Sequence, residues 1–130
     1  MRLPSITRLK RITCFEDEDV PGMFSEVQLS TPSQQVSLRC NPNTDEVVIS
    51  TTNRRGKGKA LCLLSGNYRV EWVWEMTNQQ GYGDGFRIQV ASGKESRAFD
   101  IIAIASCLQI YETKRWNGRT TACTGRGDDA

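Results

Sequence analysis

"RVEWVWEM", residues 69–76, decides the fold class, because apolar and charged side chains alternate more clearly here than elsewhere in the chain. Residues two apart on an extended strand share one face, and four apolar residues do so here: Val70, Trp72, Trp74 and Met76. Large aromatic side chains on such a face are typical of a core, so we expect Trp72 and Trp74 to be buried. The alternative is a groove in which the rings stack on a base or a sugar.

Short strand patterns continue on both sides of this stretch, at residues 8–14, 24–30, 35–40, 46–52, 86–91, 98–105 and 107–112. Turn-forming residues separate them, and the short spacing favours antiparallel hairpins over units with helical crossovers. Residues 60–65 lack β-branched side chains and precede Gly66, which predicts one helical turn. The sequence therefore predicts a mainly β fold. We expect an antiparallel meander of seven or eight strands, open or rolled into a partial barrel, with at most one short helix.

Length and composition predict one domain. The chain has 130 residues, of which 38% are hydrophobic and 25% charged, and this is enough for a core without disulfides or metal. We expect a single β-rich domain over residues 1–116 and a polar, mobile tail over 117–130. The net charge of +2 neither requires nor excludes nucleic acid.

The inventory of reactive side chains argues against catalysis. The chain has no histidine, which removes the usual general base and the usual metal ligand. Its five cysteines form no CxxC pair, so zinc or redox spacing is absent. We expect no enzyme, no metal and no cofactor. An odd cysteine number, with neither a signal peptide nor an apolar run of membrane-spanning length, predicts a cytoplasmic protein that does not enter a membrane.

The segment 77–85 is the first candidate site, because it is a long, glycine-rich connection between two good strand patterns. Its polar and aromatic side chains could contact a ligand or a peptide backbone: Asn78, Gln79, Gln80, Tyr82 and Asp84. The alternative is structural. In that case the carboxamides bind the loop's own backbone, and Tyr82 closes the edge of the core.

The basic segment 54–59 is the second candidate site. Arg54, Arg55, Lys57 and Lys59 could contact phosphates. The segment lacks the spacing of a phosphate-binding P-loop and the interleaved aromatics of single-strand binders. A solvated loop is therefore the alternative.

Three stretches resemble a small uncharacterised bacterial domain family: "TDEVVIS", "EWVWEMTNQQGYGDGFRIQV" and "IIAIASCLQIY". The resemblance covers roughly residues 24–112 and leaves out the basic segment and the tail. It implies a bacterial or phage origin and a single compact domain, and it implies no activity.

Together these features predict a non-enzymatic interaction module that binds a protein partner or itself, for example as a homodimer. The alternative is a small-ligand or nucleic-acid-binding domain that uses the segments 77–85 and 54–59. An exposed apolar patch would favour the first function, and one contiguous positive face would favour nucleic acid.

Overall fold

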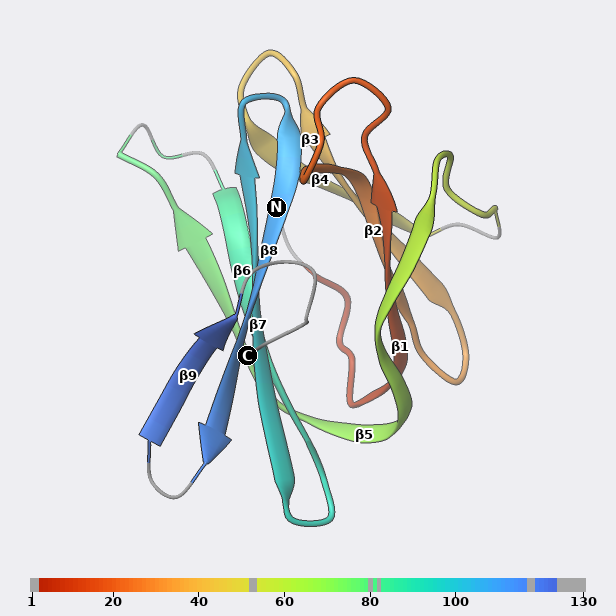
Figure 1. Ribbon diagram of the computed structural model, residues 1–130, viewed down its shortest axis with the longest axis vertical. Helices are drawn as coiled ribbons and strands as arrows, with labels where there is room; N and C mark the ends of the chain where they lie inside the picture. Colours follow the sequence, from red (N-terminus) through yellow and green to blue (C-terminus); the bar gives the residue numbers. More distant parts are fainter. Residues whose placement is uncertain (1–2, 52–53, 80, 82, 117–118, 124–130) are drawn as a thin grey trace.

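The computed structural model describes residues 3–51, 54–79, 81, 83–116 and 119–123. In these residues nine strands form one antiparallel sheet and no helix occurs, which confirms the predicted mainly β, antiparallel fold class (Figure 1). The strands are β1 (Arg8–Glu16), β2 (Phe24–Ser30), β3 (Gln35–Asn41), β4 (Glu46–Thr51), β5 (Ala60–Thr77), β6 (Gly83–Ser92), β7 (Glu95–Ile104), β8 (Cys107–Trp116) and β9 (Arg119–Cys123). Among the described residues, no helix has the length and apolar character needed to cross a membrane.

The long strand β5 joins two halves of the sheet. The strand order is β4-β3-β2-β1-β5-β6-β7-β8-β9, so β5 has β1 on one side and β6 on the other. Its first half pairs with β1, from Ala60 to Arg69, and its second half pairs with β6, from Arg69 to Thr77. In Figure 1, β5 descends on the right, curves across the bottom and rises on the left. The sheet therefore folds back on itself into two facing layers.

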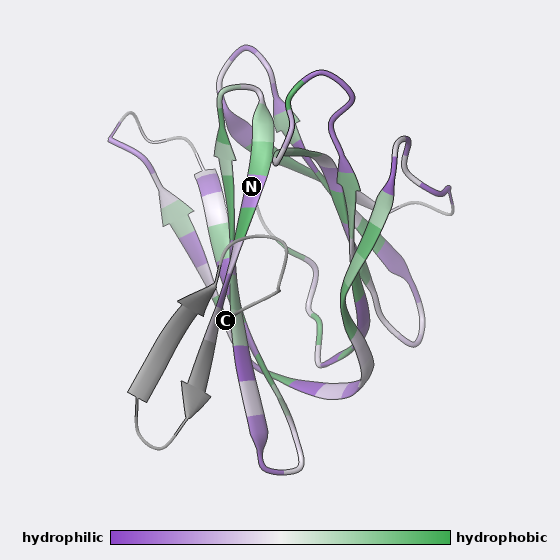
Figure 2. Cartoon of the chain, in the orientation of Figure 1, coloured by the Kyte–Doolittle hydropathy of each residue, from purple (hydrophilic) through white to green (hydrophobic). Residues whose placement is uncertain are grey.

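The core lies between these two layers. Its largest fully buried side chains come from both halves, and they include Phe24, Leu29 and Leu38 from the first and Phe86, Phe99 and Ile110 from the second. One pairing between the layers, Phe24 with Leu108, joins β2 to β8 and makes the sheet ring-like. Hydrophobic residues follow the strands in Figure 2, whereas the connecting loops are mostly hydrophilic.

The chain departs from a simple meander between β4 and β5. β4 lies at one edge of the sheet, but β5 enters beside β1, where Ala60 pairs with Phe15. The connection must therefore cross over β3, β2 and β1. Residues 54–59 are the described part of this connection, and we call them the crossover segment.

Two local expectations differ from the structure. Residues 60–65, predicted as a helical turn, belong to β5, because pairing with β1 satisfies their backbone groups. Residues 119–123, which fall in the predicted tail, form β9 against β8, with Thr113 opposite Ala122. The rest of that predicted tail, residues 117–118 and 124–130, lies outside the described residues.

Candidate functional site

The crossover segment is firmly anchored to the outer face of the first layer. Gln28 Nε2 donates to the carbonyl oxygen of Arg54 at 2.9 Å, and Gln35 Nε2 donates to the same oxygen at 3.4 Å. Gly56 is buried so tightly that an added Cβ would lie 2.6 Å from the ring of Phe15. Arg55 covers the same ring, with its guanidinium carbon 5.3 Å from the ring centroid.

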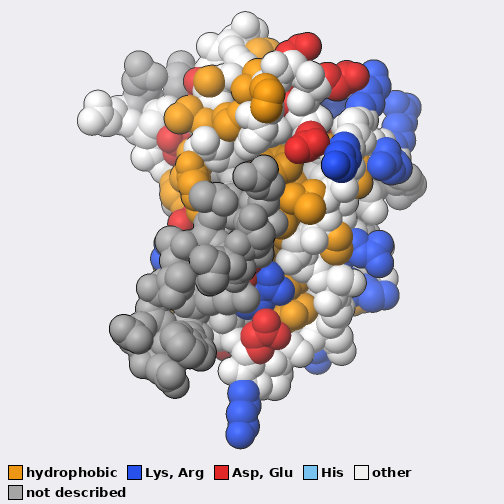
Figure 3. Space-filling view, in the orientation of Figure 1, with side chains coloured by type: hydrophobic (Ala, Val, Ile, Leu, Met, Phe, Trp, Pro, Cys, Tyr) orange, Lys and Arg blue, Asp and Glu red, His pale blue; other side chains and the backbone are white. Residues whose placement is uncertain are grey.

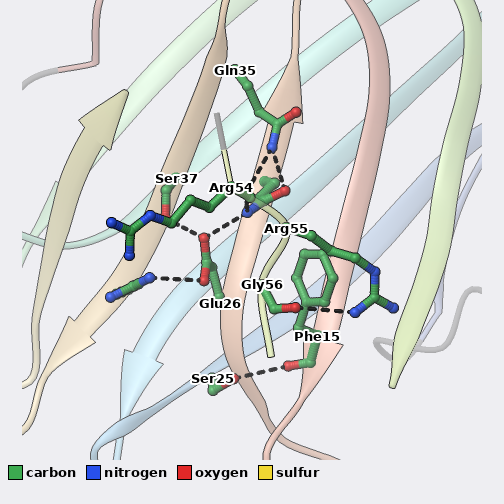
Figure 4. A network of polar contacts seen from close by, with 10 residues as sticks. Phe15, Ser25, Glu26, Gln35, Ser37, Arg54, Arg55 and Gly56 are labelled. Carbon is green, nitrogen blue, oxygen red and sulfur yellow. Dashed lines mark hydrogen bonds and ion pairs between the residues drawn. The ribbon is translucent and has the colours of Figure 1, made fainter. Parts of the chain in front are cut away.

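A buried carboxylate lies next to this segment. Glu26 on β2 is only 4% exposed, and it accepts hydrogen bonds from Gln28 Nε2 at 2.8 Å, Ser37 Oγ at 2.6 Å and Arg39 Nη2 at 3.2 Å. Figure 4 shows Glu26 between Ser37 and the crossover segment. In the same view Arg54 extends toward the Ser37 side, and Arg55 extends in the opposite direction, over Phe15. Three donors to Glu26 satisfy a carboxylate that would otherwise be costly to bury.

These groups surround a hollow of about 300 Å³, which we call the basic hollow. Its lining comprises Ser25, Glu26, Arg39, Arg54, Arg55, Gly56 and Lys57. Of the predicted nucleic-acid-binding residues, the structure brings Arg54, Arg55 and Lys57 to this hollow. Lys59 lies outside its lining, and its carbonyl oxygen accepts a hydrogen bond from Glu16 N at 2.9 Å. Figure 3 shows Lys and Arg side chains gathered along the right-hand side of the molecule.

The polar segment 77–85 is shorter as a loop than the sequence suggests. Thr77 pairs with Gly83, so the connection between β5 and β6 is the hairpin loop 78–82. Its turn is closed by Gly81 N, which donates to Asn78 O at 3.0 Å. Gly85 lies in β6, where an added Cβ would come within 2.8 Å of Ile101 O, so this glycine permits close strand packing.

The five candidate residues of that segment lie in different settings. Gln79 is exposed, Asn78 is half-buried, and Asp84 is a half-buried residue of β6. Gln80 and Tyr82 lie outside the described residues. The described members thus divide between a hairpin loop and a strand.

The predicted burial of Trp72 and Trp74 is wrong. Trp72 is 61% exposed and Trp74 is 45% exposed, and their rings stack with centroids 6.0 Å apart. The cause is a β-bulge at Glu71, because Val70 pairs with Val90 whereas Trp72 already pairs with Gln89. One extra residue moves every following side chain to the other face of the sheet.

The cross-strand partners show which way each residue of β5 faces after the bulge. Val73 now lies opposite the buried Ile88, while Trp74 lies opposite Arg87, which points outward into an ion pair with Asp100. Trp72 and Trp74 therefore stand on the outer face of the second layer.

β5 is also an edge strand beyond its contact with β1. The last bond on that side joins Val70 N to Thr7 O at 2.9 Å, and among the described residues no strand pairs with residues 71–77 except β6. The N-terminal residues diverge from the edge here and leave a hollow of about 580 Å³, which we call the edge hollow. Its lining comprises Leu3, Pro4, Ser5, Ile6, Val73, Trp74 and Glu75.

Sequence reasoning missed Glu26 and Arg39 and the whole edge hollow. In the stretch 35–40, Ser37 and Arg39 alternate with apolar residues, but this local pattern cannot show that a distant segment covers their face of the strand. The edge hollow depends on where β1 stops pairing with β5, and no local pattern encodes that point. Among the described residues, no group of three or more His, Cys, Asp or Glu side chains could hold a metal ion.

The fold and these two hollows define a small all-β domain with an exposed aromatic sheet edge and a separate basic depression. A family model described as a family of unknown function (DUF6334) matches residues 3–117, and the chain belongs to this family. The predicted resemblance to an uncharacterised domain family is thereby confirmed, over a longer stretch that includes the crossover segment. The comparisons give no match to a curated protein and none to a solved structure.

Proposed function

We propose that this domain is a non-enzymatic interaction module, which binds an extended segment of a protein partner along the edge of β5. The observation that carries the proposal is the edge at residues 71–77, which lacks a neighbouring strand among the described residues and bears two exposed, stacked tryptophans. An unpaired edge presents backbone donors and acceptors to which another chain can add. Tryptophan is strongly enriched among the residues that dominate binding energy at protein interfaces.

The size of the edge hollow supports an added strand as the occupant. A four-residue strand takes up on the order of 600 Å³, from about 3.3 Å per residue, 4.8 Å between strands and 10 Å between sheets. The edge hollow measures about 580 Å³. Residues of the β5 edge and of the segment Leu3–Ile6 both line this hollow.

The lining also indicates the chemistry of the partner. Leu3, Ile6, Val73 and Trp74 offer apolar contacts, and Glu75 adds a carboxylate. An extended segment fits this lining when apolar residues alternate with others and a basic residue faces Glu75. A second copy of this chain is a less suitable occupant, because its own β5 edge is flanked by its own N-terminal segment.

A peptide selection tests the proposal. We expect a display library of random decapeptides, selected on the purified domain, to yield an alternating apolar motif with a basic residue. Val73→Lys should abolish binding of the selected peptide, because it places a positive charge in the edge hollow. Val48→Lys is the matched control: Val48 is 46% exposed on the edge strand β4 and lies outside the hollow, so this variant should bind as wild type does.

The other outcomes count against the proposal. Failure to enrich any motif, or equal binding by the Val73→Lys variant, would show that the edge takes no added strand. Analytical ultracentrifugation of the free domain supplies the second readout. A wild-type dimer that Val73→Lys dissociates, without an enriched peptide, would replace the partner segment with a second copy of this chain.

A further inference from the structure

We propose that the basic hollow is a binding site for a phosphate group carried by a small molecule. The hollow lies on the outer face of the first layer, on different strands from the edge hollow, and its function is independent of the one proposed for β5. Four basic side chains and one carboxylate line it.

The single carboxylate does not cancel the charge of the hollow. Glu26 lies at the buried floor and already accepts hydrogen bonds from Gln28, Ser37 and Arg39. The hydrogen bond to Glu26 uses one of the five N–H donors of the Arg39 guanidinium and orients the Arg39 side chain. The Arg39 side chain is 64% exposed, so its other donors remain accessible. Glu26 thus acts as a positioning residue for Arg39. The remaining positive charge around the hollow favours an anion with several acceptor oxygens.

The backbone of the crossover segment, which carries three of these cations, is held in a defined place. The Arg54 carbonyl is bound by two glutamine side chains, and Gly56 packs directly on Phe15. Gly58 has a φ of +93°, and an added Cβ would lie 2.5 Å from Glu16 O, so the segment turns closely against β1. A backbone preorganised in this way loses little conformational entropy when a ligand binds.

The acidic residues 16–19 lie beside the other end of the segment. Glu16 donates its backbone N–H to Lys59 O, and none of residues 16–19 lines the basic hollow. Glu26 is thus the only carboxylate in the lining, and Lys59 is the one basic residue of the crossover segment that the hollow does not include.

Two observations favour a small phosphate compound over a nucleic-acid strand. The volume of about 300 Å³ lies at the lower end of the range for small-molecule pockets. Single-strand binders stack bases on aromatic rings, but the ring nearest this hollow, Phe15, is only 2% exposed under Arg55 and Gly56. The hollow thus offers charge without a stacking platform.

The test is a titration with inorganic phosphate, at an ionic strength held constant with sodium chloride, followed by calorimetry and amide NMR. We expect saturable binding with shifts centred on the amides of Gly56 and Gly58. Arg54→Gln combined with Lys57→Gln should weaken binding about tenfold or more, as expected for the loss of charged hydrogen bonds. The matched control combines Lys10→Gln with Lys94→Gln, two exposed cations outside the hollow, and should leave the affinity unchanged.

A second variant leaves the crossover segment intact. Ser25→Asp places a carboxylate in the lining and should abolish phosphate binding while circular dichroism stays that of the wild type. A thymidine oligonucleotide is the other probe. Absence of saturable phosphate binding, or an equal loss of affinity in both double variants, would overturn the proposal. Oligonucleotide binding with no phosphate binding would likewise overturn it and would identify a nucleic-acid surface instead.

Discussion

At the residue scale, burial decides the chemistry of the cysteines. Burial, with a smaller contribution from the neighbouring Cys62, raises the pKa of the Cys14 thiol from 9.0 to about 12. Burial also raises the pKa of Cys40 to about 12, helped by its contact with Asp45, and it raises the pKa of Cys107. The four cysteines with described side chains, Cys14, Cys40, Cys62 and Cys107, are free thiols. Three of them are therefore held in the neutral, unreactive form.

Alkylation of the native protein tests this chemistry. At pH 8 a thiol with a pKa of about 12 is ionised in roughly one molecule in ten thousand, and only the thiolate reacts. We expect iodoacetamide to modify the exposed Cys62 first and to leave Cys14, Cys40 and Cys107 largely intact, as measured by peptide mass spectrometry. The denatured protein, labelled without a reductant, is the control and should show all four as free thiols. Modification of Cys14 as fast as Cys62 would contradict the burial argument.

At the scale of elements, the crossover segment requires a glycine at position 58 both for its backbone conformation and for lack of space, whereas Gly22, in the turn between β1 and β2, requires only the conformation. Gly58 has a φ of +93° and no room for a Cβ beside Glu16 O. Gly22 has a similar φ of +82°, but its added Cβ would have nothing within 4 Å. Comparing alanine substitutions at the two positions therefore separates the energetic cost of the left-handed backbone conformation from the cost of the steric clash.

We expect Gly58→Ala to destabilise the fold more than Gly22→Ala. A left-handed conformation costs an alanine about 1–2 kcal/mol at either site, and the clash at Gly58 adds about 1–3 kcal/mol. Urea denaturation of both variants measures the difference in the free energy of unfolding. Equal losses would show that the crossover segment moves away from β1 without cost.

Two ion pairs join neighbouring strands of the second layer, and they differ in solvent exposure. Arg97 on β7 binds Glu112 on β8 through two bonds of 2.6 and 2.9 Å, and the Glu112 side chain is 1% exposed. Arg87 binds Asp100 through two bonds of 2.7 and 2.8 Å, but the Arg87 side chain is 43% exposed. The geometry is similar, so solvent exposure is the main difference between the two pairs.

We expect Arg97→Met to cost about 3–5 kcal/mol of unfolding free energy, because it leaves a buried carboxylate unpaired. Adding Glu112→Leu should recover most of that loss, since the unpaired charge is then gone. Arg87→Met is the matched control at an exposed pair and should cost about 1 kcal/mol or less. Urea denaturation measures all three variants. A double variant as unstable as Arg97→Met would show that packing, and not the charge, causes the loss.

At the scale of the whole molecule, β5 makes the two layers one cooperative unit. Its first half forms the last strand of the first layer, beside β1, and its second half forms the first strand of the second layer, beside β6, so neither layer is complete without it. The pairing of Phe24 with Leu108 and the shared core connect the layers again. Loss of either layer would expose the apolar face of the other.

The two layers should therefore unfold together. Cys14 in β1 and Cys107 in β8 are both buried and report on different layers. Pulsed thiol labelling across a urea series should give the same midpoint for both residues, and the midpoint from circular dichroism should coincide with it. Distinct midpoints for Cys14 and Cys107 would show that one layer can unfold without the other.

The sequence by itself determined the class of this fold and part of one site. Alternating side chains and closely spaced turn residues indicate antiparallel strands, because both signals depend only on neighbours in the chain. The same local information grouped Arg54, Arg55 and Lys57 as one basic segment.

Only the tertiary structure decided which strands became neighbours and which face each side chain took. The crossover from β4 to β5 brings the basic segment onto Glu26 and Arg39, which are distant in the chain. The bulge at Glu71 arises from the register with β6, and it turns Trp72 and Trp74 outward against an otherwise clear pattern. Strand order and register are set by contacts between distant residues, so a periodicity read along the chain cannot specify them.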